Sequence, residues 1–303
     1  GVNVKQLPCK YETLSSPETD RTRMSVKIQD GCDNFCSYCL IPYLRGRSRS
    51  RSVEDTVAEC LSVSGKTKEI VLTGIDISSY GKNIDSSLTY LLTRLSHINC
   101  RIRLGSLEAG VITPEFLAAC KGLKDFCPQF HLSLQSGSDS VLRRMNRHYT
   151  TAEYADKVEL IRKAFPYAGI TTDLICGFPT ESEEDFETTL EFLKKIGFSH
   201  IHVFGYSPRK GTAAEKLKLL NGDIVKRRCA GAQQVATECE LEYKNKFIGR
   251  ELRVLTEVTE GGYTVGFSPE YIRCYIEGAP KGEIVNAVAK ELYSDGLICA
   301  MID

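Results

Sequence analysis

Hydrophobic and polar positions along this 303-residue chain follow two alternating patterns up to about residue 246. Short runs rich in β-branched and aromatic residues are each followed by a stretch in which apolar residues recur at helical spacing. Strands that alternate with helices predict a parallel sheet with right-handed crossovers, and therefore an α/β fold. The six predicted strands are Met24–Gln29, Glu69–Gly74, Arg101–Ser106, Gln129–Gln135, Ile170–Cys176 and His200–Tyr206.

Amphipathic helices are predicted between these strands. Ser182, with Asp185 three residues later, is typical of a capping pair at a helix N-terminus. Six β-then-α units are fewer than the eight of a closed barrel, so we expect an open six-unit (β/α)6 partial barrel with its chemistry at the carboxyl ends of the strands. The apolar stripes are Leu88, Leu91, Leu92 and Leu95, then Phe116, Leu117 and Cys120, then Phe186, Leu190, Leu193 and Ile196.

The alternation stops after a long helical stretch from Gly222 to Lys246. Short apolar runs separated by Gly or Pro turns then predict a small all-β barrel, the size of an oligonucleotide-binding module. We therefore expect three parts: a linker remnant over 1–22, a (β/α)6 domain over 23–240 and a β-barrel over 241–303. The five strands predicted for the barrel are Glu251–Val258, Tyr263–Phe267, Tyr271–Ile276, Gly282–Ala289 and Leu297–Met301.

Charge is balanced overall, with 39 basic and 39 acidic residues, so composition alone indicates no general affinity for polyanions. Basic residues nevertheless cluster: seven lie within 21–51 and seven within 207–228, each against two acidic residues. These clusters are candidate phosphate contacts, and solvated helix faces are the alternative. No apolar run reaches membrane length and no secretory segment opens the chain. Thirteen cysteines without such a signal fit a reducing cytoplasm. The start at Gly1, without Met, suggests a piece of a longer protein.

Cys32, Cys36 and Cys39 form a Cys-x3-Cys-x2-Cys motif in a single short segment. Three thiolates from one loop suit three irons of a 4Fe–4S cluster and leave the fourth iron open. Part of a zinc site, or three unrelated buried cysteines, are the alternatives, but no His lies near the loop. This loop resembles that of the radical S-adenosylmethionine (SAM) enzymes, which implies that SAM binds the open iron and is cleaved to a 5′-deoxyadenosyl radical.

Candidate SAM contacts follow several strands. Tyr38, beside the third cysteine, is expected to pack against the cluster or the adenine, with ordinary packing as the alternative. Gly74 is expected to let the backbone approach SAM closely. Asp173 on the fifth strand is a further candidate, although it could instead cap a turn; His200 and His202 are interpreted as core or pocket lining. The remaining predicted cofactor contacts are Thr73, Asp76, Gln135 and Ser136.

Several segments in order look like the methylthiotransferases, radical SAM enzymes that insert sulfur and then methylate it. The resemblance runs from about Arg21 to the end, and the C-terminal module is similar to the RNA-holding TRAM domain. Residues 71–81 are most similar to the branch acting on N6-threonylcarbamoyladenosine in tRNA; the isopentenyladenosine and ribosomal-protein branches usually carry Gln-Asn or Gln-Asp there. The other matching segments are 29–51, 132–138, 173–181 and 204–209.

The resemblance implies hydrogen abstraction from C2 of the adenine next to the anticodon, sulfur insertion and methylation by a second SAM. It also implies a separate N-terminal domain with a second 4Fe–4S cluster, but only Cys9 precedes the radical loop. This chain is therefore expected to bind SAM and one cluster without completing turnover by itself. Residues 240–303 carry seven basic and eleven acidic residues, which is unusual for an RNA-holding module.

The expected partners are a tRNA anticodon stem-loop and an electron donor of the flavodoxin or ferredoxin type; no membrane is expected, and the chain is expected to be monomeric. Methylthiolation of isopentenyladenosine in tRNA, or of a ribosomal protein, is one alternative function. A non-catalytic RNA-binding chain whose cysteines hold a structural metal is another. The arginines assigned to RNA phosphates, or in the first four cases to the SAM carboxylate, are Arg45, Arg47, Arg49, Arg51 and Arg209.

Overall fold

The computed structural model describes Tyr11 and residues 22–302. The predicted linker over 1–22 thus lies outside the described residues, apart from Tyr11 and Thr22. Parallel strands form the main sheet in two groups of three, each in chain order. Their bounds are β1 (Arg23–Lys27), β4 (Glu69–Thr73) and β5 (Arg101–Leu104), followed by β6 (Gln129–His131), β7 (Gly169–Cys176) and β8 (His200–Gly205).

Backbone hydrogen bonds join the two groups. The N–H of Leu107 donates to the carbonyl of His131 at 2.8 Å, and the N–H of Ser133 donates to the carbonyl of Leu107 at 3.1 Å. Within residues 22–302 no ladder joins β8 to β1, so the sheet stays open. The predicted open (β/α)6 partial barrel is confirmed. Strand β6 is shorter than predicted because the regular ladder stops after His131; farther along, Gln135, with a φ of 70°, still forms an isolated bridge with Leu174 of β7.

A helix follows each of the six strands. Caps mark where several of them begin: the hydroxyl of Ser52 accepts from the N–H of Asp55, and Ser182 and Asp185 form the predicted capping box. Gly197, with a φ of 62°, ends the helix that Ser182 begins. The helices are α2 (Val53–Ser64), α3 (Leu88–Arg94), α4 (Pro114–Lys121), α5 (Asp139–Arg144), α6 (Thr151–Ala164), α7 (Glu183–Ile196) and α8 (Gly222–Asn245).

Small elements interrupt the first and later units near the carboxyl ends of the strands. Two short strands pair antiparallel after β1 and enclose a short helix between them. These elements shape the loops that carry the candidate site. They are β2 (Gln29–Asp30), α1 (Ile41–Arg45), β3 (Arg49–Ser50), and the 3₁₀ helices η1 (Ile77–Ser79), η2 (Ala109–Val111) and η3 (Ala213–Lys216).

Apolar stripes of the helices pack on the sheet as their spacing predicts. Leu91 and Leu92 of α3, Phe116 of α4 and Leu193 of α7 are fully buried in one core with Leu72 of β4. Fully burying such a side chain contributes about 1.5–3 kcal/mol. None of the helices in the described part of the chain combines the length and apolar character needed to cross a bilayer.

The C-terminal residues form a closed barrel of five strands, as predicted. Its core includes Val254, Cys274, Ile276 and Leu297. Helix α8 runs through the predicted domain boundary at 240/241 and ends at Asn245, and the division into domains stays a prediction. The strands are β9 (Glu251–Glu260), β10 (Tyr263–Phe267), β11 (Arg273–Ile276), β12 (Ile284–Tyr293) and β13 (Gly296–Met301).

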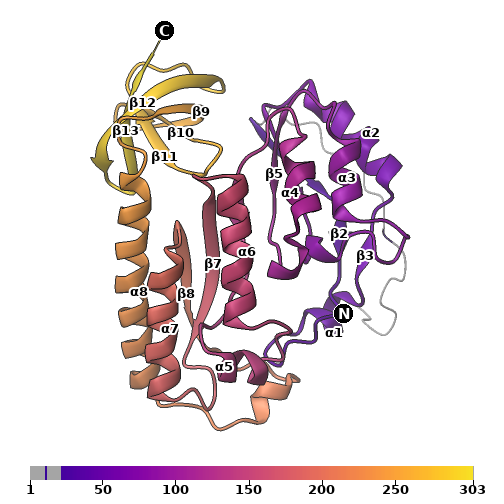
Figure 1. Ribbon diagram of the computed structural model, residues 1–303, viewed down its shortest axis with the longest axis vertical. Coiled ribbons are helices and arrows are strands. Elements are labelled where there is room, and N and C mark those ends of the chain that lie inside the picture. Colours follow the sequence, from indigo (N-terminus) through magenta and orange to yellow (C-terminus); the bar gives the residue numbers. More distant parts are fainter. Residues whose placement is uncertain (1–10, 12–21, 303) are drawn as a thin grey trace.

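This β-barrel docks against the amino ends of the parallel strands (Figure 1). Lys68, immediately before β4, forms an ion pair with Glu283 at 2.7 Å, and Asp125, shortly before β6, forms one with Arg253 at 3.0 Å. Figure 1 shows β9–β13 at one end of the molecule and α1 and α5 at the other. The carboxyl ends of the strands are therefore left clear of the β-barrel.

A buried charge cluster supports this docking. The carboxylate of Glu69 is fully buried and pairs with Arg23 at 2.8 Å and Arg103 at 2.7 Å. Arg103 also donates to the carbonyl oxygens of Ser268 and Pro269 in the β-barrel region. Burial acts to raise the pKa of Glu69, but the surrounding arginines outweigh it and lower the pKa, so the carboxylate is ionised at neutral pH.

Candidate active site

A cavity of about 210 Å³ opens at the carboxyl ends of the first four parallel strands. All three cysteines of the Cys-x3-Cys-x2-Cys motif line it. The sheet therefore brings the cysteine loop to the edge where parallel α/β folds place their chemistry. The other lining residues are Asn34, Tyr38, Ile41, Ile75, Asp76, Ser106, Leu107, Glu108, Ser133, Gln135 and Arg147.

Backbone contacts fix the shape of the cysteine loop. Gly31 has a φ of 74°, and a Cβ there would lie 2.1 Å from the carbonyl oxygen of Arg47, so only glycine fits. The N–H of Cys32 donates to the carbonyl of Gly46 at 3.1 Å. Ser37 is held by the loop after α5, since its N–H donates to the carbonyl of Met145 at 3.0 Å. The loop is thus anchored at its start and in its middle.

The three thiols form a donor set that fits an iron–sulfur cluster. Burial raises the pKa of Cys32 to about 11 and also raises that of Cys39, so both are neutral thiols until a metal binds. Among the described residues, no fourth Cys and no His lines this cavity. A closed structural zinc site takes four such ligands. Three thiols alone therefore suit a 4Fe–4S cluster with one open iron.

Arg147 is a site residue that the sequence analysis missed. Its Nη1 lies 3.3 Å from Sγ of Cys36, and its Nη2 lies 2.8 Å from a carboxylate oxygen of Glu108 and 3.1 Å from the carbonyl of Ser133. Its Nε donates to the hydroxyl of Tyr149 at 3.1 Å. Because four partners fix the guanidinium, the arginine holds a positive charge beside a motif cysteine.

The turn after β4 is organised by a buried glutamine. Oε1 of Gln29 accepts from the backbone N–H groups of Ile75 at 3.0 Å and Asp76 at 2.8 Å. A Cβ on Gly74 would lie 2.9 Å from the same oxygen, so Gly74 makes room for Gln29. Neither Gly74 nor Thr73 lines the cavity, whereas Asp76 does. Predicted SAM contacts of Gly74 and Thr73 remain predictions, and the space around Gly74 has this other explanation.

Asp76 and Glu108 place two carboxyl groups in the cavity. Burial, and next the charge of Glu108, raises the pKa of Asp76 to about 6. Nδ2 of Asn34 lies 3.5 Å from Oδ2 of Asp76. A half-buried carboxylate of raised pKa is a natural acceptor for a cationic group, because the cation restores its charged form.

Tyr38 and Gln135 also line the cavity, as expected of SAM contacts. Ser136 does not: its buried hydroxyl accepts from the N–H of Ser138 and lies 3.5 Å from the hydroxyl of Thr189. The structure thus places Ser136 in the packing between the strand end and α7. Its predicted role in cofactor binding is not supported by this position.

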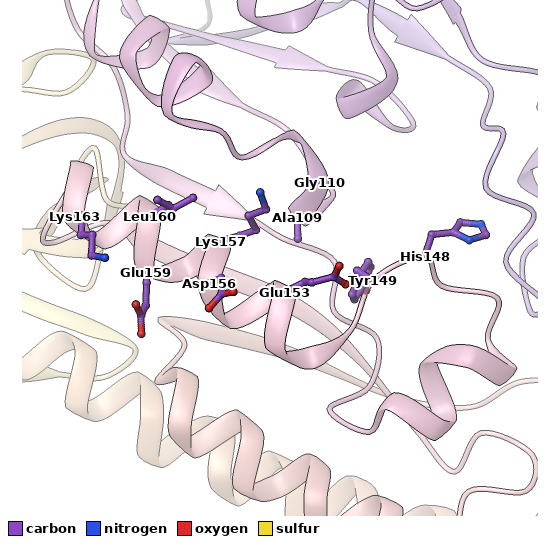
Figure 2. A pocket seen from close by; sticks show the side chains of 10 residues that line it. All are labelled: Ala109, Gly110, His148, Tyr149, Glu153, Asp156, Lys157, Glu159, Leu160 and Lys163. Atoms are coloured by element: carbon purple, nitrogen blue, oxygen red, sulfur yellow. The ribbon is translucent and has the colours of Figure 1, made fainter.

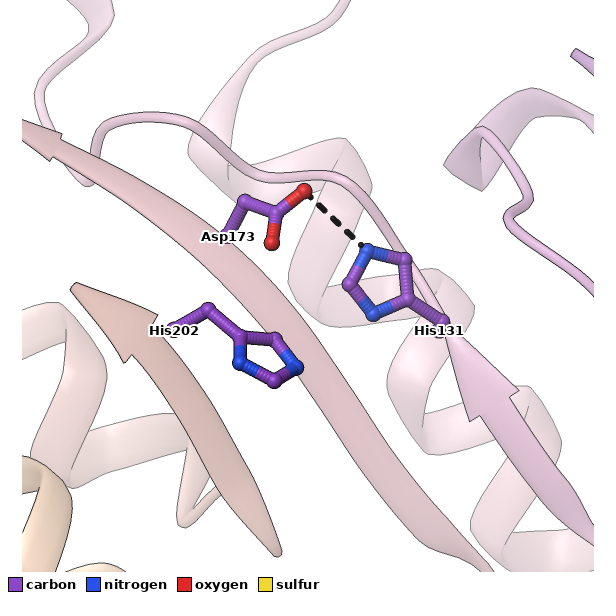
Figure 3. Close-up of side chains that lie close together, drawn as sticks. All are labelled: His131, Asp173 and His202. Carbon is purple, nitrogen blue, oxygen red and sulfur yellow. Dashed lines mark hydrogen bonds and ion pairs between the residues drawn. The ribbon is translucent and has the colours of Figure 1, made fainter. Parts of the chain in front are cut away.

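Asp173 lies one layer deeper in the partial barrel. In Figure 3 it faces His131, with Oδ2 of Asp173 3.3 Å from Nε2 of His131, and His202 lies beside them. The three side chains share the inner sheet face because Asp173 is opposite His202 in register, and His131 is opposite Thr171, two residues before Asp173. Ligand atoms of this trio lie within 4.8 Å of one another.

This trio could hold a divalent transition metal through two imidazoles and one carboxylate. A hydrogen-bond chain offers a simpler explanation for two of its members. Nε2 of Gln129 donates to the hydroxyl of Thr171 at 3.0 Å, and that hydroxyl lies 3.0 Å from Nδ1 of His131. His131 then donates from Nε2 to Asp173. Asp173 is therefore paired with His131 inside the (β/α)6 partial barrel, and it does not line the cysteine cavity.

The row of arginines after the cysteine loop divides into two groups. Arg49 is 6% exposed and pairs with Asp30 at 2.9 Å, and Arg51 is 7% exposed and pairs with Glu59. This burial argues against direct contact of Arg49 and Arg51 with RNA. Arg45 and Arg47 are exposed. Arg209 is also exposed, in the loop after β8, which reaches the cysteine loop where the N–H of Ala214 donates to the carbonyl of Ser37 at 2.8 Å.

Two larger cavities contain no cysteine. One, of about 490 Å³, lies between η2 and α6 (Figure 2), with acidic and basic side chains of α6 along its wall. Tyr149 is the residue through which it adjoins the Arg147 network. The other, of about 500 Å³, lies between the inner sheet face and the β-barrel and includes His131 and His202. In the part of the chain that the structure describes, neither of these two cavities is lined by a thiol that could bind a cluster.

Comparison with known proteins identifies relatives of the whole described region. Residues 26–193 match the radical SAM superfamily. The chain is 36% identical over 302 residues to the threonylcarbamoyladenosine tRNA methylthiotransferase MtaB of Thermotoga maritima, covering 97% of this chain and 69% of the relative. It is 43% identical over 237 residues to MtaB of Aquifex aeolicus, covering 77% of this chain and 58% of the relative.

A relative of another specificity is nearly as similar. The tRNA-2-methylthio-N(6)-dimethylallyladenosine synthase of Clostridium botulinum (strain Langeland) is 38% identical over 254 residues, covering 82% of this chain and 56% of the relative. The chain thus spans between 56% and 69% of the length of these three relatives.

Solved structures agree with the fold. Coproporphyrinogen III oxidase (HemN) from Escherichia coli, a radical SAM enzyme, matches 89% of this chain and 67% of its own, with a TM-score of 0.53 and 14% identity. The radical SAM methyltransferase TsrM from Kitasatospora setae, with cobalamin and a [4Fe–4S] cluster bound, matches 63% of this chain and 38% of its own, with a TM-score of 0.54 and 14% identity. At this identity the likeness establishes the fold alone.

Proposed function

Because this chain belongs to the radical SAM superfamily and, within it, to the methylthiotransferases, we propose that it serves to methylthiolate N6-threonylcarbamoyladenosine in tRNA, at C2 of the adenine next to the anticodon. The observation that carries this proposal is the 36–43% identity to relatives named for that substrate. A cavity that gathers the three motif cysteines at the carboxyl edge of the sheet supports it.

The cofactors of the family are a 4Fe–4S cluster and SAM, and the residues of the cavity fit them. Cys32, Cys36 and Cys39 would hold the cluster. When bound, cluster and SAM together supply the radical that removes a hydrogen atom from the substrate. The chain's own side chains would bind and orient the cofactors and the substrate base, and would exclude water from the cavity.

Roles in binding SAM are assigned from position. Asp76 would accept a hydrogen bond from the amino group of SAM, since a cation beside this carboxylate offsets the cost of its burial. Gln135 offers an amide to the ribose or carboxylate, and the ring of Tyr38 an apolar surface for the adenine. Arg147 would fix Cys36 and neutralise part of the cluster's negative charge. Buried Leu107 helps to keep water from the cavity.

Contacts with RNA are proposed at both ends of the sheet. The exposed Arg45, Arg47 and Arg209 lie around the cysteine loop, where a base must enter the cavity. We propose further that the β-barrel is a TRAM-like RNA-holding module, and that residues 23–240 and 241–303 are the two domains. A monomeric chain and an electron donor of the flavodoxin or ferredoxin type complete this proposal.

A second candidate substrate has its own support. The Clostridium botulinum relative named for dimethylallyladenosine is 38% identical, close to the identity with the MtaB proteins. This alternative keeps the same chemistry and the same cavity, and changes only the group carried by N6 of the adenine.

Mass spectrometry of tRNA nucleosides from cells lacking the full-length protein tests the proposal. We expect 2-methylthio-N6-threonylcarbamoyladenosine to disappear and its unthiolated precursor to accumulate. Loss of the methylthio group from isopentenyladenosine instead would favour the second candidate. Unchanged levels of both nucleosides would contradict a role in tRNA methylthiolation.

A further inference from the structure

An aromatic and cationic surface borders the cysteine cavity without lining it. Phe35, Tyr43 and Arg47 form this surface, named here the loop platform. The rings of Phe35 and Tyr43 are 5.7 Å apart and nearly perpendicular, and the guanidinium of Arg47 lies 4.5 Å from the centre of the Phe35 ring. Tyr43 is 54% exposed, as is its neighbour Leu44. The exposed Tyr43 and Leu44 beside a partly exposed Phe35 place an apolar surface next to the cavity that packing does not explain.

The backbone holds this surface in place at a cost. Phe35 has a φ of 48°, a conformation that bulky side chains rarely adopt. The side-chain amide of Asn146 donates to the carbonyl oxygens of Asn34 at 3.2 Å and Phe35 at 3.1 Å. Strain of this kind persists only where surrounding contacts enforce it, and it concentrates at functional sites. The fold therefore fixes the Phe35 ring in position.

The loop platform is continuous with the cavity. Phe35 directly precedes the cluster ligand Cys36, and Ile41, on the same short helix as Tyr43, lines the cavity. Any polymer that inserts one unit into the cavity places its neighbouring unit against this surface. The occupant must therefore be part of the substrate that enters the cavity.

The charges of the surface select the class of that occupant. The side chain of Arg47 is 73% exposed, and Arg45 is also exposed. Asp33, half exposed, pairs with Arg47 at 3.2 Å. An exposed ion pair of this kind contributes little, so a phosphate can replace the carboxylate. Flat rings beside exposed guanidinium groups are the combination that binds unpaired nucleotides.

We propose that the loop platform binds the unpaired nucleotide adjacent to the base that enters the cavity. Tyr43 stacks on that nucleotide, Phe35 supports the Tyr43 ring from a nearly perpendicular position, and Arg47 contacts the nucleotide's phosphate. This inference rests on the proposed RNA substrate and adds to it a site for a second nucleotide, which positions the loop for modification.

Equilibrium binding of a fluorescently labelled anticodon stem-loop to the chain with its cluster reconstituted tests the proposal. We expect Tyr43→Ala to weaken binding roughly 5- to 100-fold and Tyr43→Phe to stay within about twofold of the original chain. Arg47→Ala is expected to lower the slope of log K against log salt by about one. Iron content and circular dichroism establish that each variant is folded and loaded.

Tyr90→Ala is the matched control. Tyr90 is 48% exposed and Arg94 lies 5.8 Å from the centre of its ring, but the pair is on α3 and away from the cavity. We expect its RNA affinity to stay within about twofold of the original chain. If the original chain binds the stem-loop and Tyr43→Ala binds it equally well, or no worse than Tyr90→Ala, the loop platform is excluded as a nucleotide site. If the original chain binds no stem-loop at all, the proposed function fails first, and the platform proposal with it.

Discussion

Nη1 of Arg147 lies 3.3 Å from Sγ of Cys36 while Nη2 of the same guanidinium lies 2.8 Å from a carboxylate oxygen of Glu108. One side chain thus links a motif cysteine to an acid from the loop after β5. Arg147 reaches this position from the loop after α5, more than a hundred residues along the chain from Cys36. The cysteine loop is therefore held by the fourth β/α unit of the fold as well as by its own backbone contacts.

Replacing Arg147 with Met keeps an unbranched stem and removes the donors. A hydrogen bond to a ligand sulfur stabilises the reduced, more negative cluster, so Arg147→Met is expected to lower the reduction potential by on the order of tens of millivolts. Anaerobic redox titration followed by electron paramagnetic resonance measures this. Arg143→Met, in which an exposed arginine of α5 is replaced, is the control. Equal potentials in the two variants would contradict the role of Arg147.

Removing one motif thiol is expected to abolish cluster binding. Cys36→Ala leaves two ligands in the loop, so reconstituted protein should lack absorbance at about 400 nm and retain little iron. Cys229→Ala removes a thiol of α8 that packs near Cys176, away from the cavity. This variant should keep both the absorbance and the iron. A coloured, iron-loaded Cys36→Ala protein would show that the ligand assignment is wrong.

Asp76→Asn is expected to stabilise the cluster-free protein at neutral pH. Burial raises the pKa of Asp76 to about 6, above the value of about 3.9 in the unfolded chain, so between these values the folded state binds more protons. Stability of the unchanged protein therefore falls as the pH rises from 4 to 6. At pH 7 the variant should be more stable by up to about 3 kcal/mol, and below about pH 4 the difference should vanish.

Urea unfolding at a series of pH values measures this difference. SAM binding to the cluster-loaded protein is expected to weaken in the same variant, because the amide cannot carry the negative charge. A variant that is less stable at pH 7, or one that binds SAM as well as the original, would contradict the assignment of Asp76.

Glu69→Gln is expected to destabilise the chain by about 3–5 kcal/mol at pH 7, because it leaves buried arginines without their carboxylate. Attraction by these arginines outweighs burial and lowers the pKa of Glu69. Its contribution is thus present above about pH 4.3, the unfolded-state value, and is lost as the pH falls through the lower folded-state pKa. Chemical unfolding at pH 7 and below pH 4 should show that the difference in unfolding free energy between the original chain and Glu69→Gln becomes smaller at low pH. The exposed Glu283→Gln is the control, with an expected change below about 1 kcal/mol.

Much of the fold could be predicted from local pattern. The six parallel strands and five barrel strands were found because each combines an apolar run with a turn signal. The strand predicted over 129–135 is longer than β6, because Ser133 and Gln135 have a strand-like pattern but line the cavity instead of continuing the regular ladder. Local pattern does not reveal the irregular backbone of this stretch, in which Gln135 has a φ of 70° and meets β7 only through an isolated bridge to Leu174.

The site was predictable only where adjacent residues define it. Cys32, Cys36 and Cys39 share one loop, so their spacing sufficed. Arg45, Arg47, Arg49 and Arg51 look equivalent in sequence, yet only the last two are buried, because Asp30 and Glu59 meet them in the folded chain. The approach of Arg147 to Cys36 is a tertiary contact with no local signature.

Docking of β9–β13 against the amino ends of the parallel strands determines which part of an RNA substrate the β-barrel could contact. β7 has eight residues and spans roughly 25 Å, so the β-barrel and the carboxyl edge of the sheet are separated by about that length along β7. Under the proposed function, the anticodon loop inserts its base into the cavity. The β-barrel would then contact the helical stem of the same RNA. Trimming a substrate to its loop would then remove the contact with the β-barrel and keep the contact at the cavity. The resulting loss of binding free energy should add to the loss caused by Tyr43→Ala.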